Sequence, residues 1–241
     1  MPAEFQNNVS RETFSNEDLQ WLQKIFNEKE KSLKQYADLI LWWNKKLNLV
    51  SRDSGLDDIN RHIVHSLTLS LVPSVKTADI LLDVGTGGGL PGVPLAIIRD
   101  YYTESRYQHV ILCDKVEKKL WAVKQMVSKL NLVNVHCLSK DINDLEREDL
   151  GLGTNDVSRE TLGSEQQDVV VISKHAFKFD DLMHSISKKI TSEFVLLKGF
   201  SEAKEELSRV DEPFAAEFFS LEEFFGDPFY AGKAVVHVKR A

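Results

Sequence analysis

A glycine-rich segment carries the clearest chemical signal in this 241-residue sequence. The segment reads DVGTGGGLPG over residues 83–92, follows an apolar run at 80–82 and leads into a helix-like stretch. Glycine adopts positive φ and lets a ligand approach the backbone closely, and α/β proteins bind ligands at turns that follow the carboxyl ends of strands. A simple connection does not need four glycines within five residues, so the segment predicts a site for a nucleotide-like ligand.

The spacing of the glycines narrows the choice of ligand. The dinucleotide pattern G-x-G-x-x-G fails when read from Gly85, because its sixth position is Leu90. Read from Gly87, the pattern is completed only with an unusual proline at its fifth position. The pattern D-x-G-x-G-x-G, which runs from Asp83 to Gly89, instead resembles the cofactor loop of class I methyltransferases. We therefore expect S-adenosylmethionine as the cofactor.

Acidic residues follow the next two expected strands. Asp114 ends the apolar run at 110–114, where a carboxylate can accept hydrogen bonds from the ribose hydroxyls of an adenosine. Its alternative role is the N-cap of the following helix, which is compatible with ligand binding. A third run ends at residue 138 and is followed by Asp141 and Ile142, whose backbone groups are placed to frame an adenine.

The elements that position these residues change character along the chain. Residues 15–47 carry two helical apolar stripes, and Ser15 with Asp18 has the pattern of a capping box. From residue 79, short apolar runs alternate with amphipathic stretches, which predicts βαβ units, a parallel sheet and helices on both faces. The expected strands lie at 80–84, 110–114, 135–138, 169–173 and 194–198.

These patterns predict two structural units. A helical extension at residues 1–72 is expected to pack on a methyltransferase domain at residues 73–241. The final segment, AVVHVKRA, predicts one arm of an antiparallel hairpin at the edge of the sheet. Residues 146–167 have no periodic apolar pattern and predict a long surface loop.

Composition restricts partners and location. A net charge of −7 argues against indiscriminate binding to nucleic acid, and basic runs are usually solvated helix faces. Two such runs stand out: Lys45, Lys46, Arg52 and Arg61, and Lys115, Lys118, Lys119 and Lys124. No apolar stretch approaches the ~20 residues of a membrane span and no leader pattern is evident, so a cytoplasmic protein without a membrane partner is expected. Cys113 and Cys137 lack metal-ligand spacing and are interpreted as reduced, buried thiols.

Several motifs together resemble one known family. They are WWNKKLNLVS at 42–51, RHIVHSL at 61–67, DVGTGGGLPGVPLAI at 83–97, ISKHAF at 172–177 and LLKG at 196–199. Over roughly residues 33–240 the chain is similar to the GidB/RsmG family of small-subunit ribosomal RNA methyltransferases. The resemblance implies an α/β class I, Rossmann-like methyltransferase fold with a mostly parallel seven-stranded sheet and an N-terminal helical cap. It also implies methylation of N7 of one guanine in 16S rRNA of the small ribosomal subunit, by a protein expected to be a monomer.

The resemblance assigns roles to individual positions. The cofactor-binding set expected from motif and family is Asp83, Gly85, Gly87, Gly89, Leu90, Asp114, Asp141, Ile142 and Lys174. The basic set expected to contact RNA is Arg52, Arg61, His62, Lys198 and Lys233. Two positions depart from the family pattern. Lys174 stands where arginine is usual, which keeps the charge but loses the planar fork of donors. His65 replaces the aspartate of the RHI-x-DS pattern.

The implied reaction needs no catalytic base and no metal, because guanine N7 carries an unprotonated lone pair. The sequence therefore predicts no catalytic acid or base, and its seven histidines stay unassigned. Three alternatives remain open at this point. They are an NAD-dependent oxidoreductase, which the failed glycine spacing and the missing Tyr-x-x-x-Lys pattern disfavour; a non-catalytic protein of the same fold that binds S-adenosylmethionine or RNA; and methyl transfer to a small molecule or protein.

Overall fold

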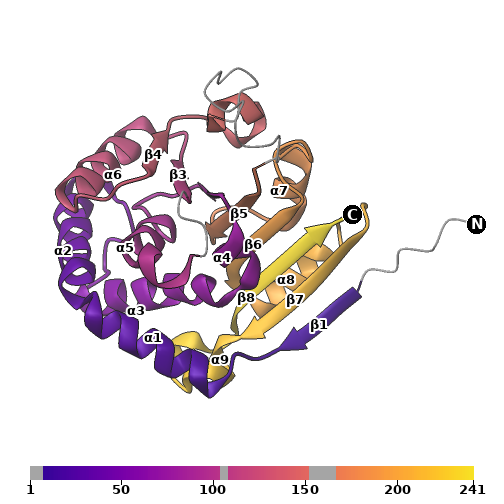
Figure 1. The fold of residues 1–241 in the computed structure, drawn as a ribbon, viewed down its shortest axis with the longest axis horizontal. Helices are drawn as coiled ribbons and strands as arrows, with labels where there is room; N and C mark the ends of the chain where they lie inside the picture. The colour runs from indigo at the N-terminus through magenta and orange to yellow at the C-terminus, as the bar shows by residue number, and fades with distance from the viewer. Residues whose placement is uncertain (1–7, 104–107, 152–166) are drawn as a thin grey trace, which may run out of the picture.

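A single twisted sheet organises the chain, with helices on both of its faces (Figure 1). The computed structural model describes residues 8–103, 108–151 and 167–241. Within them the strand order is β1-β7-β8-β6-β5-β2-β3-β4, and only β8 runs antiparallel to its neighbours. The strands are β1 (Asn8–Glu12), β2 (Ile80–Val84), β3 (His109–Cys113), β4 (Val135–Leu138), β5 (Val169–Lys174), β6 (Glu193–Gly199), β7 (Phe214–Ser220) and β8 (Lys233–Arg240). This confirms the expected α/β architecture with a mostly parallel sheet.

Two details of the sheet differ from the expectation. The described sheet has eight strands rather than seven, because β1 pairs in parallel with β7 and adds an outer strand. Strand β8 does not lie at the edge; it is hydrogen-bonded to β6 on one side and to β7 on the other. A strand's own residues do not reveal how many neighbours it pairs with, since pairing is made through the backbone.

The N-terminal helices cover one face of the sheet together with α5 and α6. Ser15 and Asp18 form the expected capping box at the start of α1. Leu33, Ile63, Val93 and Val123, from four different helices, belong to one continuous apolar cluster. The helical extension therefore packs on the core, while its division from the rest at residue 72 stays a prediction. The helices on this face are α1 (Asn16–Glu28), α2 (Glu30–Leu47), α3 (Leu56–Leu67), α4 (Pro73–Thr77), α5 (Gly92–Tyr102) and α6 (Glu117–Lys129).

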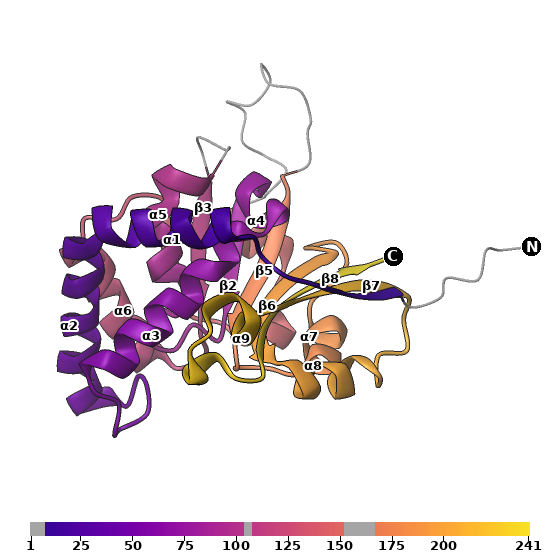
Figure 2. The same ribbon diagram turned by 90° about the horizontal axis from the view of Figure 1, so that it is seen from below.

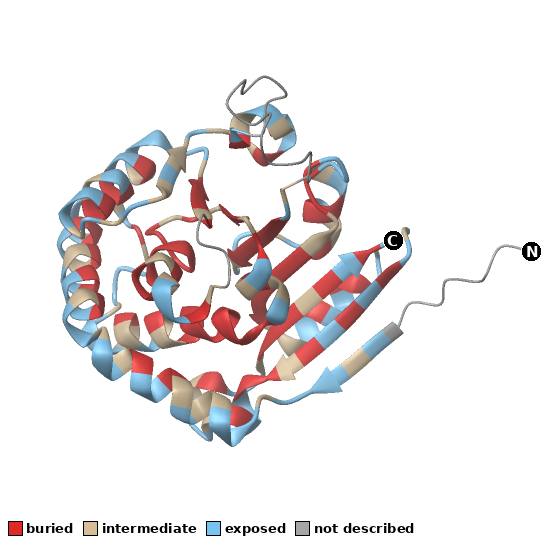
Figure 3. Cartoon of the chain, viewed as in Figure 1, coloured by how far each residue is buried: buried red, intermediate tan, exposed pale blue. Residues whose placement is uncertain are grey.

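The opposite face carries a second apolar cluster. Helices α7 (Phe179–Ser185) and α8 (Phe200–Leu207) lie beneath β6, β7 and β8 (Figure 2). Buried side chains line the inner side of both layers, whereas the outer helix faces are exposed (Figure 3). The remaining elements are the helix α9 (Leu221–Phe225) and the 3-10 helices η1 (Thr68–Leu71), η2 (Ile142–Asp144), η3 (Arg147–Leu150) and η5 (Pro228–Tyr230).

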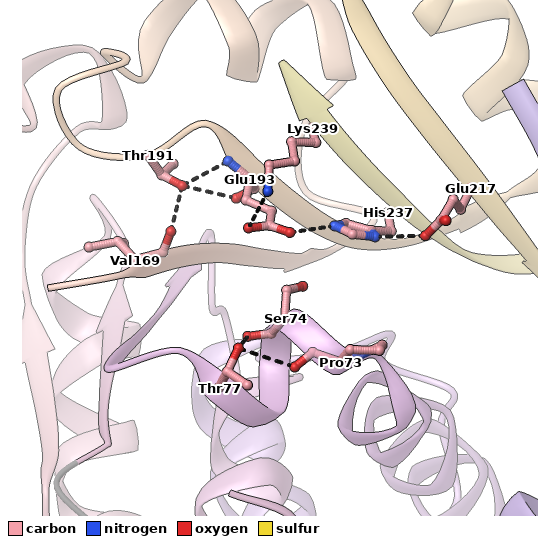
Figure 4. Close-up of polar contacts among 9 residues, drawn as sticks. All are labelled: Pro73, Ser74, Thr77, Val169, Thr191, Glu193, Glu217, His237 and Lys239. Atoms are coloured by element: carbon pink, nitrogen blue, oxygen red, sulfur yellow. Dashed lines mark hydrogen bonds and ion pairs between the residues drawn. The ribbon is translucent and has the colours of Figure 1, made fainter. Parts of the chain in front are cut away.

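A polar row crosses β6, β8 and β7 on the face away from α7 and α8 (Figure 4). The His237 ring lies between two carboxylates, with Nε2 at 2.8 Å from Glu193 Oε1 and Nδ1 at 3.0 Å from Glu217 Oε2. Burial opposes charge on His237, but the hydrogen bonds to both carboxylates outweigh it and raise the pKa of the ring. His237 therefore links three strands and has a structural role.

Three further expectations meet the structure at particular segments. The expected loop at 146–167 begins instead with η3, and its residues 152–166 lie outside the described part of the chain. Cys113 is a buried free thiol, whereas Cys137 is only partly buried. None of the helices in the described ranges is long and apolar enough to cross a membrane.

Candidate active site

The glycine loop is fastened to the strand beside it. The amides of Gly85 and Thr86 both donate to the carbonyl of Cys113, at 2.9 and 3.1 Å. Gly85, Gly87 and Gly89 have φ values of 68°, 54° and 97°, a region that other residues adopt only with strain. The loop thus turns sharply at the carboxyl end of β2, as its sequence predicts.

The three loop glycines with positive φ meet different surroundings. A methyl group on Gly85 would lie 2.6 Å from Ala176 Cβ, and one on Gly89 would lie 2.6 Å from Val93 Cγ2. The same addition at Gly87 would come no nearer than 3.6 Å to the carbonyl oxygen of Leu49. At Gly85 and Gly89, then, close packing of the protein itself also requires glycine, and the contact of these residues with the cofactor stays a prediction.

Asp83 lies beneath the loop rather than along it. One carboxylate oxygen accepts hydrogen bonds from the Thr86 hydroxyl at 2.6 Å and from the Gly92 amide at 2.9 Å. The side chain is fully buried, and burial raises the pKa of Asp83 to about 7 against the opposing effect of these two bonds. Asp83 therefore shapes the loop from below, and its direct contact with the cofactor stays a prediction.

Asp114 joins the loop to the next strand end. Its Oδ2 accepts the Gly87 amide at 2.9 Å, and its Oδ1 accepts the Val116 amide at 2.8 Å. The N-cap of α6 is Val116, so Asp114 does not take the capping position considered as its alternative. Each carboxylate oxygen has a second lone pair, which leaves acceptors for the hydroxyls of a ribose.

The third strand end completes one edge of the sheet. Asp141 accepts the Asn143 amide at 3.1 Å and pairs with Lys115 at 3.5 Å, while Ile142 is buried. Because β2, β3 and β4 are parallel neighbours, their carboxyl ends bring the glycine loop, Asp114 and Asp141 together. A turn with room at Gly87, a carboxylate for sugar hydroxyls and a backbone segment over an apolar residue fit an adenosine with a polar tail.

Basic side chains from three distant segments meet around Phe229. Lys174, at the end of β5, has its Nζ 3.1 Å from Nδ1 of His62 on α3. Lys233, at the start of β8, has its Nζ 3.3 Å from the centre of the Phe229 ring, and the Arg61 guanidinium lies 5.7 Å from the same ring. We call these four basic residues the basic cluster. The sequence selected each of them, and the fold places them side by side.

Electrostatics within the basic cluster favour loss of charge. Burial, followed by the nearby Lys233, lowers the pKa of Lys174 to about 8. Burial and then Lys174 lower the pKa of His62 to about 4, so its imidazole is neutral near neutral pH. The neutral ring can accept a hydrogen bond from the Lys174 ammonium, which holds that side chain in place.

Two residues of the expected RNA-binding set lie elsewhere. Lys198 is buried on β6, and its Nζ lies 2.7 Å from Oε1 of Glu206, which is equally buried. A lysine that is buried and paired with a carboxylate inside the protein does not face a phosphate, so its assignment is corrected. Arg52 is exposed in the segment after α2, and its Nε donates to Asn48 at 2.9 Å.

The structure also places a residue that the sequence reading left unassigned. His65 is fully buried, with its ring centre 6.0 Å from that of His175 and 5.9 Å from that of Tyr230. Burial and the neighbouring cations hold its pKa well below the ordinary value, and neither ring nitrogen has a hydrogen-bond partner in the described part of the chain. The site therefore has a neutral ring where the family pattern has a carboxylate. Its proximity to Lys174 could not be deduced from a separation of more than 100 residues.

The sheet order, the glycine turn after β2 and the acidic residue after β3 define a methyltransferase that depends on S-adenosylmethionine. Residues 29–222 match the GidB family, described as rRNA small subunit methyltransferase G. The chain belongs to this family. The oxidoreductase alternative is thereby set aside.

The chain is similar to several individual proteins. The chain is 34% identical to the ribosomal RNA small subunit methyltransferase G of Flavobacterium johnsoniae, over 81% of this chain and 84% of the relative. It is 28% identical to the corresponding protein of Cytophaga hutchinsonii, over 91% and 99% of the two chains. A 40% match to the Chlorobaculum tepidum protein spans 47% of this chain and half of that relative. A crystal structure of a Geobacter sulfurreducens methyltransferase aligns with a TM-score of 0.46 at 13% identity, covering 73% of this chain and 78% of that one.

Proposed function

We propose that the protein transfers a methyl group from S-adenosylmethionine to N7 of a guanine in 16S rRNA of the small ribosomal subunit. One observation carries the proposal beyond family membership. Ala176 and Phe177 lie two and three residues after Lys174 of the basic cluster and pack against Gly85 of the cofactor loop. The groups suited to phosphate and the groups suited to the cofactor therefore adjoin, as transfer to a nucleic acid requires.

The bound cofactor would supply an electrophilic methyl group on a sulfonium. Guanine N7 attacks with an unprotonated lone pair, so this chain has only to bind, orient and exclude water. Gly87 and Asp114 would hold the cofactor, and Asp141 with Ile142 would hold the adenine by backbone contacts. Alignment of this kind can contribute about 7–11 kcal/mol to lowering a barrier. A reaction that needs only binding and alignment requires no general base, and the sequence predicts none.

Charge in the basic cluster and at the neighbouring His65 suits a substrate that becomes cationic as it reacts. His62 and His65 are neutral near neutral pH because burial and adjacent cations lower their pKa values. Arg61, Lys174 and Lys233 would then bind backbone phosphates, where positive charge is favourable. In this proposal the protein acts as a cytoplasmic monomer.

The test is transfer of labelled methyl to purified small subunits that lack the modification, followed by chemical cleavage at 7-methylguanine. A single cleavage site in 16S rRNA is the expected result. Label at another atom or nucleotide, or on protein, would reject the N7 assignment. Tight binding of S-adenosylmethionine with no transfer to subunits, RNA or protein would instead support the non-catalytic alternative.

A further inference from the structure

The two basic runs of the sequence meet on the surface of the fold. One run includes Lys45 and Lys46 on α2, and the other includes Lys118 on α6; these two helices lie side by side (Figures 1 and 2). Trp42 and Trp121 stand among these lysines with 46% and 56% of their surface exposed. Apolar side chains gathered in one exposed patch mark an interaction site more often than single scattered ones do, so this juxtaposition calls for an explanation.

A groove lies beside the exposed ring of Trp121. Trp43 is buried at its base and makes edge-to-face contacts with Trp42, at 4.5 Å between ring centres, and with Trp121, at 5.2 Å. The ammonium of Lys46 lies 3.5 Å from the centre of the Trp42 ring, which fixes a cation at the rim. The groove has a volume of about 600 Å³ and is lined by Trp43, Lys46, Leu47, Glu117, Lys118 and Trp121. We call it the tryptophan groove.

The tryptophan groove shares Lys46 with a second groove, and both lie at the end of α2 that leads toward the cofactor loop. The second groove also contains Lys45 and Arg52. A few residues further along the chain, Leu49 and Val50 lie against Gly88, with a methyl group on that glycine placed 3.3 Å from Leu49 Cβ. Both grooves and the contact with Gly88 involve residues 41–54, so the tryptophan groove and the cofactor loop lie at the same end of α2.

We propose that the tryptophan groove holds an unpaired nucleobase of the RNA substrate, stacked on Trp121, while Lys46 and Lys118 contact the flanking phosphates. Two features favour RNA over an apolar protein partner. The groove joins an aromatic ring to a rim in which two lysines outnumber the acidic Glu117, on a chain whose net charge is −7. Aromatic rings stack on unpaired bases of any sequence, and lysines that follow the strand neutralise its backbone. The inference rests on the proposed function for the identity of the RNA.

Binding is tested with octauridylate, a single strand that exposes its bases, and with a hairpin duplex of equal charge. Fluorescence anisotropy of the labelled oligonucleotides gives both affinities for the purified full chain. Loss of one stacked base should weaken binding of the strand by about 5- to 150-fold in Trp121→Ala, whereas Trp121→Phe should retain most of the affinity. Lys118→Ala should lower the salt dependence of binding by about one counterion.

Tyr101→Ala is a matched control. Tyr101 is also an exposed aromatic residue beside a lysine, with Lys29 Nζ 5.0 Å from the centre of its ring. Lys29 caps the start of α2, about 20 Å along the helix axis from Trp42. This variant should bind octauridylate like the wild type. Equal affinity of wild type and Trp121→Ala for the strand would overturn the proposal, and so would preferential binding of the duplex. A dimer that Trp121→Ala dissociates would likewise overturn it, because the groove would then be an interface between copies.

Methylation assays separate this inference from the proposed function. With small subunits as substrate, Trp121→Ala should raise KM by a similar factor, with kcat and the affinity for S-adenosylmethionine unchanged. If the wild type modifies no guanine but still binds octauridylate through Trp121, the proposed reaction fails and the base-binding groove stands. If the wild type modifies guanine and Trp121→Ala has an unchanged KM and affinity, only the groove is rejected.

Discussion

Lys174 gives the proposed function a specific pH dependence. An ordinary lysine stays charged well above pH 9, but burial and Lys233 lower the pKa of Lys174 to about 8. A lowered pKa means that this ammonium loses its proton as the pH rises through about 8. Its charged fraction then falls from roughly nine-tenths at about pH 7 to roughly one-tenth at about pH 9. If phosphate binding needs the charge, kcat/KM for small subunits should fall about tenfold over that interval.

Lys174→Arg supplies the comparison, because a guanidinium stays protonated throughout this range. The variant should keep its activity near pH 7 and lose most of the decline toward pH 9. Burial also lowers the pKa of Lys233, but Lys233 and the RNA titrate in both proteins. The difference between the two pH profiles therefore reports the titration of Lys174. Profiles are measured as initial rates at low subunit concentration, where kcat/KM reports groups of the free enzyme. Identical declines in wild type and variant would refute the assignment of Lys174 to phosphate binding.

Three further substitutions test the remaining assignments. Asp114→Asn should weaken S-adenosylmethionine binding by about 10- to 150-fold in calorimetry, because the carboxylate that receives the Gly87 amide is lost; unchanged affinity would contradict its role. Lys198→Met should lower the free energy of unfolding by about 3–5 kcal/mol in denaturant titrations, because Glu206 is left buried without its partner; a loss of RNA affinity at full stability would restore the discarded assignment. Gly89→Ala should lower the free energy of unfolding by about 2–4 kcal/mol in denaturant titrations, because alanine is strained at positive φ and its methyl group would contact Val93. In Gly226→Ala the added methyl group meets nothing within 4 Å, so only the strain of positive φ should be lost from the stability. Equal losses in the two variants would show that packing at Gly89 is unimportant.

The cofactor side of the site was largely visible in the sequence. Strand β2 occupies the predicted residues, the turn at Gly85 has the predicted conformation, and Asp114 reaches the loop as its position at a strand end implies. Local pattern succeeds here because adjacent parallel strands end at one edge, so residues at those ends are neighbours by construction. The contacts of these residues with S-adenosylmethionine are still predictions.

The basic side of the site was only partly predictable. Sequence motifs selected Arg61, Lys174 and Lys233 as RNA-binding or cofactor-binding residues. They also selected Lys198, which forms an ion pair with Glu206 inside the core. The sequence pattern of a lysine near the end of a strand is the same whether its side chain points to solvent or to a buried carboxylate eight residues away. Phe229, which receives two of the cations, carries no signal in the sequence at all.

By itself, the sequence determined the class of fold, the cofactor loop and the family, because these depend on residue periodicity and on glycine spacing over short stretches. Tertiary structure alone decided the interior position of β8, the added strand β1 and the meeting of α2 with α6 that forms the tryptophan groove. Such contacts join segments that are distant along the chain. They depend on which strand edges pair and on which apolar helix faces pack together. That choice is made by the whole folded chain, so no local pattern encodes it.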